Sequence, residues 1–158
     1  MRYMLLIPLL FLGCSFSNTT KKVKNFTKCY VKQMPAPFWV CYQSSFISVG
    51  KVHTDKVTRL KQEEAYSVGV SDLVFKLQSK TVIFLRKLGI EDKNFIKNDI
   101  KDYVILSALQ GDSWYSDKEK MVYVQVKINE KEFKNFLYEK LKNKVKQKEF
   151  ESAFNETF

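Results

Sequence analysis

Histidine and arginine are both scarce in this sequence. Its 158 residues include one histidine, His53, and three arginines, so lysine supplies nearly all of the 27 basic side chains. A single histidine excludes metal sites built from several histidines and leaves few groups that exchange protons near neutral pH. Nucleic-acid sites favour the planar guanidinium of arginine, so a net charge of +10 carried by lysine does not indicate nucleic-acid binding. We therefore expect no nucleic-acid partner.

Motifs that carry catalysis are missing as well. The sequence contains no glycine-rich phosphate loop, no clustered metal-ligand spacing and no nucleophile with an identifiable base. His53 precedes Asp55 in a predicted strand-to-helix turn, which is typical of a surface histidine. Glu63 and Glu64 are adjacent on a predicted helix, so their side chains diverge by about 100° and cannot form a carboxylate pair. We expect a non-enzymatic protein without cofactor or metal.

Long hydrophobic runs are scarce, and the one at the N-terminus is short. Residues 4–12 are apolar, whereas a membrane span needs about 20 such residues and a secretory signal core only about 7 to 15. Gly13 then precedes Cys14, the small-residue and cysteine pair at which lipoprotein processing attaches diacylglycerol and cleaves. We predict a signal peptide over 1–13 and a lipidated, palmitate-bearing Cys14. Ser15 in place of aspartate favours the outer membrane, and cleavage of a soluble secreted protein elsewhere is the alternative.

Residues 14–34 have the composition of a flexible tether. They are rich in Ser, Thr, Asn and Lys and contain no acidic residue. Their lysines either strengthen docking of the anchored chain onto anionic lipid head groups or only keep a solvated linker extended. The sequence leaves both interpretations open.

Two further cysteines, Cys29 and Cys41, form an even pair in a protein expected to be exported. Oxidising conditions outside the cytoplasm permit a disulfide between them, which would pin the tether to the start of the domain. The alternative is that Cys41 is a small buried hydrophobic residue.

The pattern over 35–148 predicts one α+β domain, in which a small antiparallel three-stranded sheet has a long helix and a C-terminal helix packed on one face. The long helix is the clearest element. Ala65, Gly69, Leu73 and Leu77 recur at steps of four and give residues 57–80 one apolar face, which we expect to continue through 81–85. Alanine and glycine on this face would let the helix lie close to the sheet.

The remaining elements follow from alternation, caps and turn residues. Trp39, after two prolines, is expected to plug an edge of the core. Next come a predicted strand over 46–52, with a bulge or close approach at Gly50, and a short helix capped by Asp92 that contains Phe95, Ile96 and Ile100. Strands over 103–109 and 121–128 are expected to be joined by a polar turn with Gly111, Asp112, Ser116 and Asp117. The chain is then predicted to form a helix capped by Asn129, with apolar residues as far as Val145, and a frayed tail over 149–158.

Trp114 and Tyr115 fall in the predicted loop between the two best strands. Loops carry much of protein function, and an exposed aromatic pair is a typical contact point for a protein partner. The alternative is that the two side chains fold back over the end of the sheet as a satellite of the core.

The order of these landmarks resembles the Lpp-twenty lipoproteins of bacterial outer membranes and their flagellum-associated relatives. The residues that carry the resemblance are Cys14 after the apolar run, Pro37-Phe38-Trp39-Val40 at the start of the domain, the strand ending in Val49-Gly50, the helix over 65–73 with Asp72-Leu73, and the strand Val122-Tyr123-Val124-Gln125-Val126 before the closing helix. The resemblance implies lipoproteins of the cell envelope, some of them contributing to flagellar assembly or motility and some immunogenic. It implies no shared reaction and no catalytic residue.

The sequence therefore predicts a non-enzymatic lipoprotein, anchored in the cell outer membrane by its N-terminal lipid, that acts through contacts with envelope or flagellar proteins. The main alternative is an adhesin-like surface antigen that binds a host or matrix ligand through the Trp114 loop or the lysine-rich face of the closing helix. A carrier of a small ligand would need a dry internal pocket.

Overall fold

The fold is known from a computed structural model that describes residues 28–42, 44–92 and 96–158. The signal peptide over 1–13, Cys14 and most of the predicted tether lie outside these residues, as does Phe95. The described elements, in chain order, are β1 (Cys29–Val31), β2 (Met34–Ala36), α1 (Phe38–Cys41), β3 (Ile47–His53), α2 (Arg59–Lys87), α3 (Lys97–Ser107), β4 (Leu109–Ser116), β5 (Met121–Lys127), α4 (Glu130–Leu141) and α5 (Gln147–Thr157).

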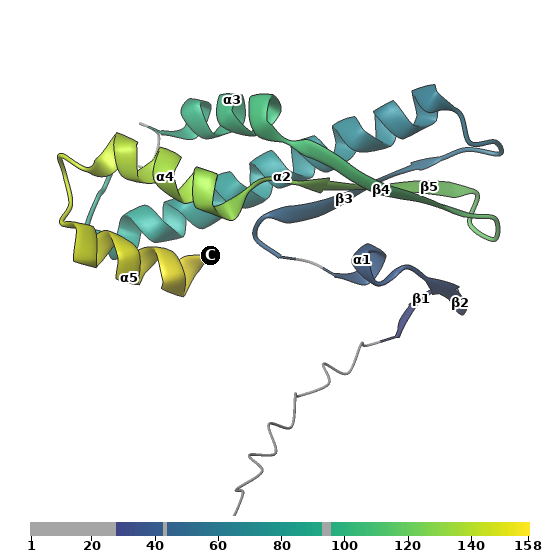
Figure 1. Ribbon diagram of the computed structural model, residues 1–158, viewed down its shortest axis with the longest axis horizontal. Helices are drawn as coiled ribbons and strands as arrows, with labels where there is room; N and C mark the ends of the chain where they lie inside the picture. Colours follow the sequence, from purple (N-terminus) through teal and green to yellow (C-terminus); the bar gives the residue numbers. More distant parts are fainter. Residues whose placement is uncertain (1–27, 43, 93–95) are drawn as a thin grey trace, which may run out of the picture.

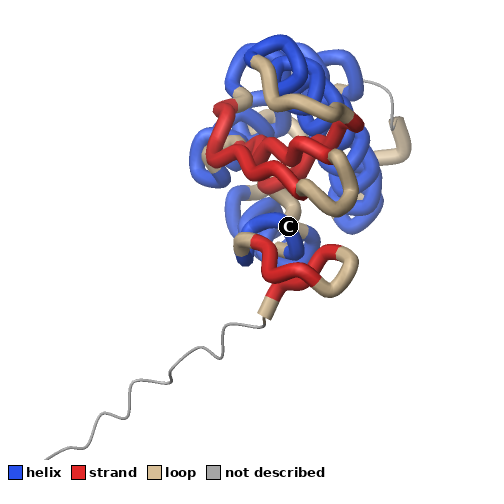
Figure 2. The backbone as a smooth tube through the Cα atoms, turned by 90° about the vertical axis from the view of Figure 1, so that its right-hand side faces the viewer, coloured by secondary structure: helices blue, strands red, loops and turns tan. Residues whose placement is uncertain are grey.

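The predicted α+β class with a three-stranded antiparallel sheet is confirmed. The strand order is β3-β5-β4, and α2 packs against both β3 and β5. Figure 1 shows that α2 runs beyond the end of the sheet, where α4 and α5 gather beside it. In both Figure 1 and Figure 2 the β1–β2 hairpin lies below the main sheet, beyond the three-layered body of the domain.

Helix α2 meets the sheet through glycine on both sides. A Cβ atom placed on Gly50 of β3 would lie 1.8 Å from the carbonyl oxygen of Ala65 and 2.5 Å from the backbone nitrogen of Gly69, both on α2. A Cβ on Gly69 would lie 2.6 Å from Cγ2 of Val126 on β5. The helix backbone therefore rests directly on the strand backbone, and the close approach expected at Gly50 is confirmed.

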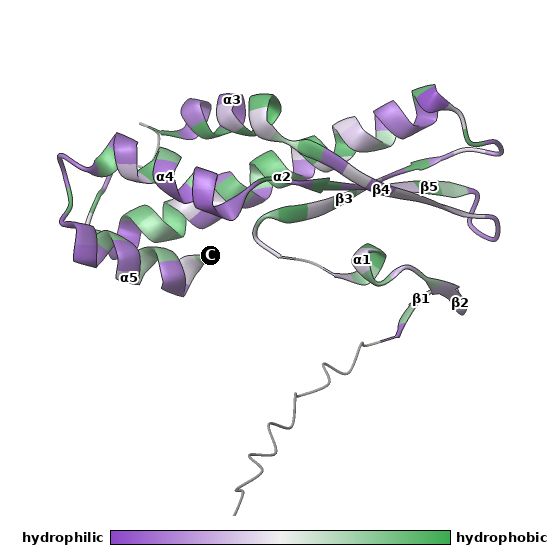
Figure 3. Cartoon of the chain, viewed as in Figure 1, coloured by the Kyte–Doolittle hydropathy of each residue, from purple (hydrophilic) through white to green (hydrophobic). Residues whose placement is uncertain are grey.

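The buried face of α2 runs from Ala65 to Leu85, and the predicted continuation of the helix through 81–85 is confirmed. Thr58 caps its start by accepting a hydrogen bond from the backbone N–H of Lys61 at 3.3 Å, and Gly89 follows its end with a φ of 69° that favours glycine. In this continuation Phe84 and Leu85 are fully buried. Figure 3 shows hydrophobic and hydrophilic residues alternating around α2, which is the pattern of a helix with one buried face.

Aromatic side chains build the core at the end of α2 that extends past the sheet. Phe46 precedes β3, Phe84 lies on α2, Phe133 on α4, and Phe150 and Phe154 on α5, and all five are buried in one cluster. The ring centroids of Phe84 and Phe150 are 5.3 Å apart in an edge-to-face arrangement. This cluster joins the helical end of the domain to the sheet.

The strand predicted over 103–109 is wrong, because these residues belong mainly to helix α3. Ile100 and Val104 are one turn apart and both fully buried, and the ring of Tyr103 stacks on Phe136 of α4 at 4.5 Å. Contacts with α2 and α4 thus override the β propensity of the Tyr-Val-Ile run. The start of this helix also differs from the prediction, since its N-cap position is Ile96 and not Asp92.

The polar turn predicted around Gly111 and Asp112 is also wrong. These two residues lie within β4, where the register with β5 shifts between Gln110 and Ser113. A glycine inside a strand often marks such a bulge. The actual turn follows Ser116 and ends at Lys120, whose φ is 54°.

The C-terminal residues form a packed helix and not a frayed tail. Asn129 does cap α4, since its side chain accepts hydrogen bonds from the N–H groups of Lys131 and Glu132. However, α4 ends at Leu141, before Val145, and residues 147–157 form α5. Phe150 and Phe154, one helical turn apart, insert into the aromatic cluster and hold α5 in place.

The predicted tether is too long at its C-terminal end. Residues 29–36 form the β1–β2 hairpin, with Lys32 and Gln33 at its turn. Pro37 caps the short helix α1, on which Trp39 is half-buried.

The glycine contact between α2 and β3 predicts a large effect of one methyl group. We expect Gly50→Ala to lower the free energy of unfolding by roughly 3 kcal/mol, because the helix backbone must move to admit a Cβ. Gly111→Ala is the matched control, since its Cβ would meet the movable side chain of Gln125. Urea unfolding of both variants tests this, and equal midpoints would contradict the close contact.

The packing of α5 predicts that Phe150 supports the whole domain. We expect Phe150→Ala to cost about 3–5 kcal/mol of unfolding free energy, as for other buried phenylalanines. Phe75→Ala, at an exposed position on α2, should change it by less than about 0.5 kcal/mol. Thermal unfolding of the two variants measures the difference, and a wild-type transition for Phe150→Ala would show that α5 is dispensable.

Candidate functional site

The prediction that Trp114 and Tyr115 form an exposed contact pair on a loop is wrong. Both lie in β4 and both are half-buried. The Trp114 ring is 5.3 Å from the ring of Tyr123, and the Tyr115 hydroxyl donates a hydrogen bond to the carbonyl oxygen of Thr54 at 3.0 Å. The structure therefore favours the alternative, in which they pack against the sheet.

Cys29 and Cys41 are joined in a disulfide, with the sulfurs 2.08 Å apart and the Cα atoms 5.7 Å apart. Cys41 is exposed, so it is not the small buried hydrophobic residue of the alternative. The bridge fastens β1 to α1. A hydrogen bond of 3.0 Å from Lys118 Nζ to the carbonyl oxygen of Lys32 then ties this N-terminal hairpin to the turn between β4 and β5.

The remaining titratable candidates lie on the surface. His53 is exposed at the end of β3. Glu63 pairs with Arg59 at 2.8 Å and Glu64 with Lys61 at 2.7 Å, which are ordinary ion pairs along the first turns of α2. Within residues 28–42, 44–92 and 96–158, no three histidine, cysteine or acidic side chains gather as metal ligands would. None of the helices in this part of the chain is long and apolar enough to span a membrane.

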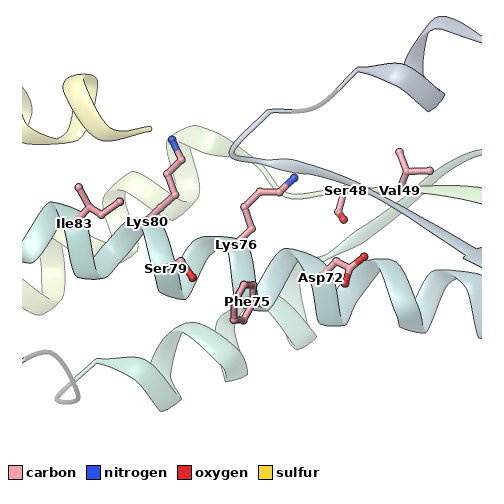
Figure 4. A pocket seen from close by; sticks show the side chains of 8 residues that line it. All are labelled: Ser48, Val49, Asp72, Phe75, Lys76, Ser79, Lys80 and Ile83. Atoms are coloured by element: carbon pink, nitrogen blue, oxygen red, sulfur yellow. The ribbon is translucent and has the colours of Figure 1, made fainter. Parts of the chain in front are cut away.

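A groove lies between β3 and α2. It has a volume of about 530 Å³ and is open to solvent. The side chains that line it come from one strand and one helix (Figure 4): Ser48, Val49, Asp72, Phe75, Lys76, Ser79, Lys80 and Ile83.

Two lysines in the groove brace the backbone around it. Lys76 Nζ donates hydrogen bonds to the carbonyl oxygens of Ser44 at 3.1 Å and Ile47 at 2.7 Å, and Figure 4 shows its side chain reaching from α2 toward β3. Lys80 Nζ donates to the carbonyl oxygen of Thr157 at 2.7 Å. Burial lowers the pKa of Lys76, an effect that nearby Asp72 opposes. These ammonium groups therefore sit in a partly desolvated place with neutral carbonyls as partners.

Two apolar side chains in the groove are left open to water. Phe75 is 74% exposed and Ile83 is 48% exposed. Phe75 lies on the opposite side of α2 from the buried stripe through Leu73 and Leu77, since it is two residues from each. In the sequence, the signal for this groove was a large aromatic residue, Phe75, that does not fall on the apolar face of the helix. Trp114 was predicted to be the contact residue instead, and Phe75 was not considered.

A second exposed apolar group lies at the end of α3 and the start of β4. Leu106 is 85% exposed, and Ile105 and Leu109 beside it in the sequence are also exposed. These residues do not line the β3–α2 groove. Leu106, on α3, provides a comparison for experiments on Phe75, because it tests apolar exposure outside the groove.

Bracing by Lys76 predicts a loss of stability when its ammonium group is removed. We expect Lys76→Met to lower the free energy of unfolding by about 1.5–3 kcal/mol, because two carbonyl oxygens lose a charged donor. Lys148→Met, at an exposed position on α5, should leave the unfolding midpoint unchanged within error. Guanidinium unfolding of both variants is the measurement, and equal stability of the two would show that Lys76 is not a brace.

No protein-family model matches the chain, and no curated protein is significantly similar to it. The resemblance to Lpp-twenty lipoproteins thus stays a prediction from short motifs, and the candidate site depends on its own geometry.

Proposed function

We propose that this chain is a lipid-anchored protein of the bacterial outer membrane that acts without catalysis, by binding another protein of the cell envelope. A flagellar partner is the narrower form of this proposal. The observation that carries it is the β3–α2 groove, in which apolar side chains are exposed while the charged ones brace the protein itself.

Anchoring is supported by the first fourteen residues. The apolar run over 4–12 has the length of a signal core, and Gly13 precedes Cys14 at its end. The disulfide supports export, since Cys29 and Cys41 pair with each other and leave Cys14 as the remaining cysteine. A thiol that is not needed for the bridge is free for lipid attachment.

Protein binding is supported by the chemistry of the groove. An apolar surface that stays in contact with water costs free energy, and a large exposed aromatic residue beside a hollow is typical of a contact site. Lys76 and Lys80 donate to backbone carbonyl oxygens of this chain. The arrangement suits the recognition of a protein surface better than chemistry on a small substrate.

The surface-antigen alternative loses its main support, because Trp114 and Tyr115 are half-buried in β4. Its second support, the lysine-rich face of α4, is also weakened. Lys134 pairs with Glu151 of α5, and Lys140 pairs with Asp99 of α3 at 2.8 Å. These lysines connect helices of this domain.

The proposal is tested in cells with two readouts. Mass spectrometry should find Cys14 as an acylated N-terminus, and Cys14→Ser should retain residues 1–13, because processing requires the lipidated thiol. A photo-reactive amino acid in place of Phe75 should yield a discrete protein adduct on illumination.

The control for the adduct is the same photo-reactive residue in place of Leu106, which is similarly exposed but lies outside the groove. We expect an adduct at position 75 and not at position 106. An unmodified Cys14 in the mature protein would refute the anchor, and equal labelling at the two positions would refute the groove as the contact site.

A further inference from the structure

One edge of β3 has no strand beside it in the described chain. The sheet order places β3 at the edge, with β5 on its other side. The N–H of Ile128 donates to the carbonyl of Phe46 at 3.1 Å, and the N–H of Thr54 donates to the carbonyl of Lys120 at 2.7 Å. In an antiparallel ladder the direction of these groups alternates along the strand. Even-numbered residues of β3 therefore bond to β5, and odd-numbered residues point to the open edge.

The protein already covers the first part of that edge. Ile47 forms an isolated bridge with Ser44, and its carbonyl also accepts a hydrogen bond from Lys76. Farther along the strand, the N–H and C=O groups of Val49 and Lys51 point to the same side. Val49 lines the groove and Lys51 is exposed. The open edge thus offers a short row of backbone donors and acceptors beside an apolar hollow.

The side chains around this edge suit an extended chain. Phe75 and Ile83 lie along the groove that Val49 lines. Alternate residues of an extended segment point to opposite faces, so apolar residues at every second position of a visiting strand could cover Phe75. Backbone hydrogen bonds and alternate side-chain pockets are how exposed sheet edges recognise peptides elsewhere.

The charges around the edge select the kind of segment. Lys76 and Lys80 line the groove together with one carboxylate, Asp72, and Lys51 lies on the edge strand itself. Gly50 faces α2, so the exposed side chain of the next residue, Lys51, points to the opposite face of the sheet. Acidic side chains on that face of the segment complement Lys51, and basic ones would be repelled.

We propose that β3 receives an extended segment of a partner protein as an added strand of the sheet, with apolar residues toward Phe75 and acidic residues toward Lys51 on the opposite face. This inference rests on the proposed function, in that the chain acts by binding a protein. It assigns the partner an unfolded or edge-strand segment in which apolar and acidic residues alternate.

The test is selection from a displayed library of random twelve-residue peptides on the disulfide-bonded, lipid-free protein, followed by fluorescence-polarisation titration of the selected peptides. We expect enrichment of sequences that alternate apolar with Asp or Glu. Binding should weaken as salt is added, because the acidic contacts are exposed and screened.

A matched pair of variants at one position tests the role of the strand backbone. Lys51→Pro removes the outward N–H, whereas Lys51→Ala removes only the side chain. We expect Lys51→Pro to bind the selected peptides at least about tenfold more weakly than Lys51→Ala, which matches the loss of one or two hydrogen bonds. Phe75→Ser should also weaken binding about tenfold, and Leu106→Ser should leave it within about twofold.

Modified peptides keep the test decisive even if Lys51→Pro fails to fold. N-methylation of alternate amides removes donors from one edge of the selected peptide, so one of the two methylation registers should abolish binding and the other should preserve it. Equal binding of both registers, failure to enrich any peptide, or enrichment of basic sequences would overturn the proposal. Dimerisation of the protein through β3 would overturn it too, since the occupant would then be a second copy.

The two proposals fail in different ways. If no peptide binds but the photo-adduct at position 75 persists, the groove contacts a protein without strand addition. If the photo-adduct is absent and Cys14 is unmodified, the proposed function fails whatever the peptides do.

Discussion

The contact between Gly50 and Gly69 fixes how close α2 lies to the sheet, and the other packing follows from that distance. With no side chain between them, the helix backbone touches the strand backbone. Side chains on the flank of α2 can then reach past the strand, and Lys76 reaches the carbonyl oxygens of Ser44 and Ile47. The same close packing brings Phe75 and Val49 to the two sides of one groove. A larger residue at either glycine would separate the strand from the helix side chains that line the groove.

Part of the basic charge of this protein is structural. Among the lysines that connect separate segments, Lys76 and Lys80 bond to backbone carbonyls, and Lys87, Lys134 and Lys140 pair with Glu156, Glu151 and Asp99. Exposed ion pairs contribute little individually, but bonds to carbonyl oxygens in partly buried places contribute more. The net charge of +10 is thus a poor guide to function, because some of the lysines that contribute to it brace the fold.

Residue spacing along the chain correctly predicted the long helix α2 and the strand β5. The four-residue spacing from Ala65 to Leu77 gave the long helix, and the glycine within it indicated its close contact with the sheet. The alternation in Val122 and its neighbours gave β5. The run at Tyr103 misled, because β-branched residues form a strand or a helix according to what covers them, and here α2 and α4 do. Phe150 and Phe154 carried a helical spacing that the expectation of a frayed tail ignored.

The candidate site was beyond the reach of sequence patterns for a different reason. That β3 lies at an edge of the sheet depends on the strand order β3-β5-β4, and no local pattern encodes that order. The groove exists only where this edge meets the flank of α2. Phe75 gave a hint, since a large aromatic residue opposite the buried stripe is unusual, but its neighbours on β3 come from the tertiary fold.

Function in this account depends on an open strand edge beside an apolar groove. Amide hydrogen exchange of the free, disulfide-bonded protein, resolved residue by residue with NMR, tests this most directly. The account predicts fast exchange at Val49 and Lys51 and slow exchange at Ser48, Gly50 and Val52, whose amides bond to β5. Slow exchange at Val49 and Lys51 would show that the edge is already covered and would contradict the central claim.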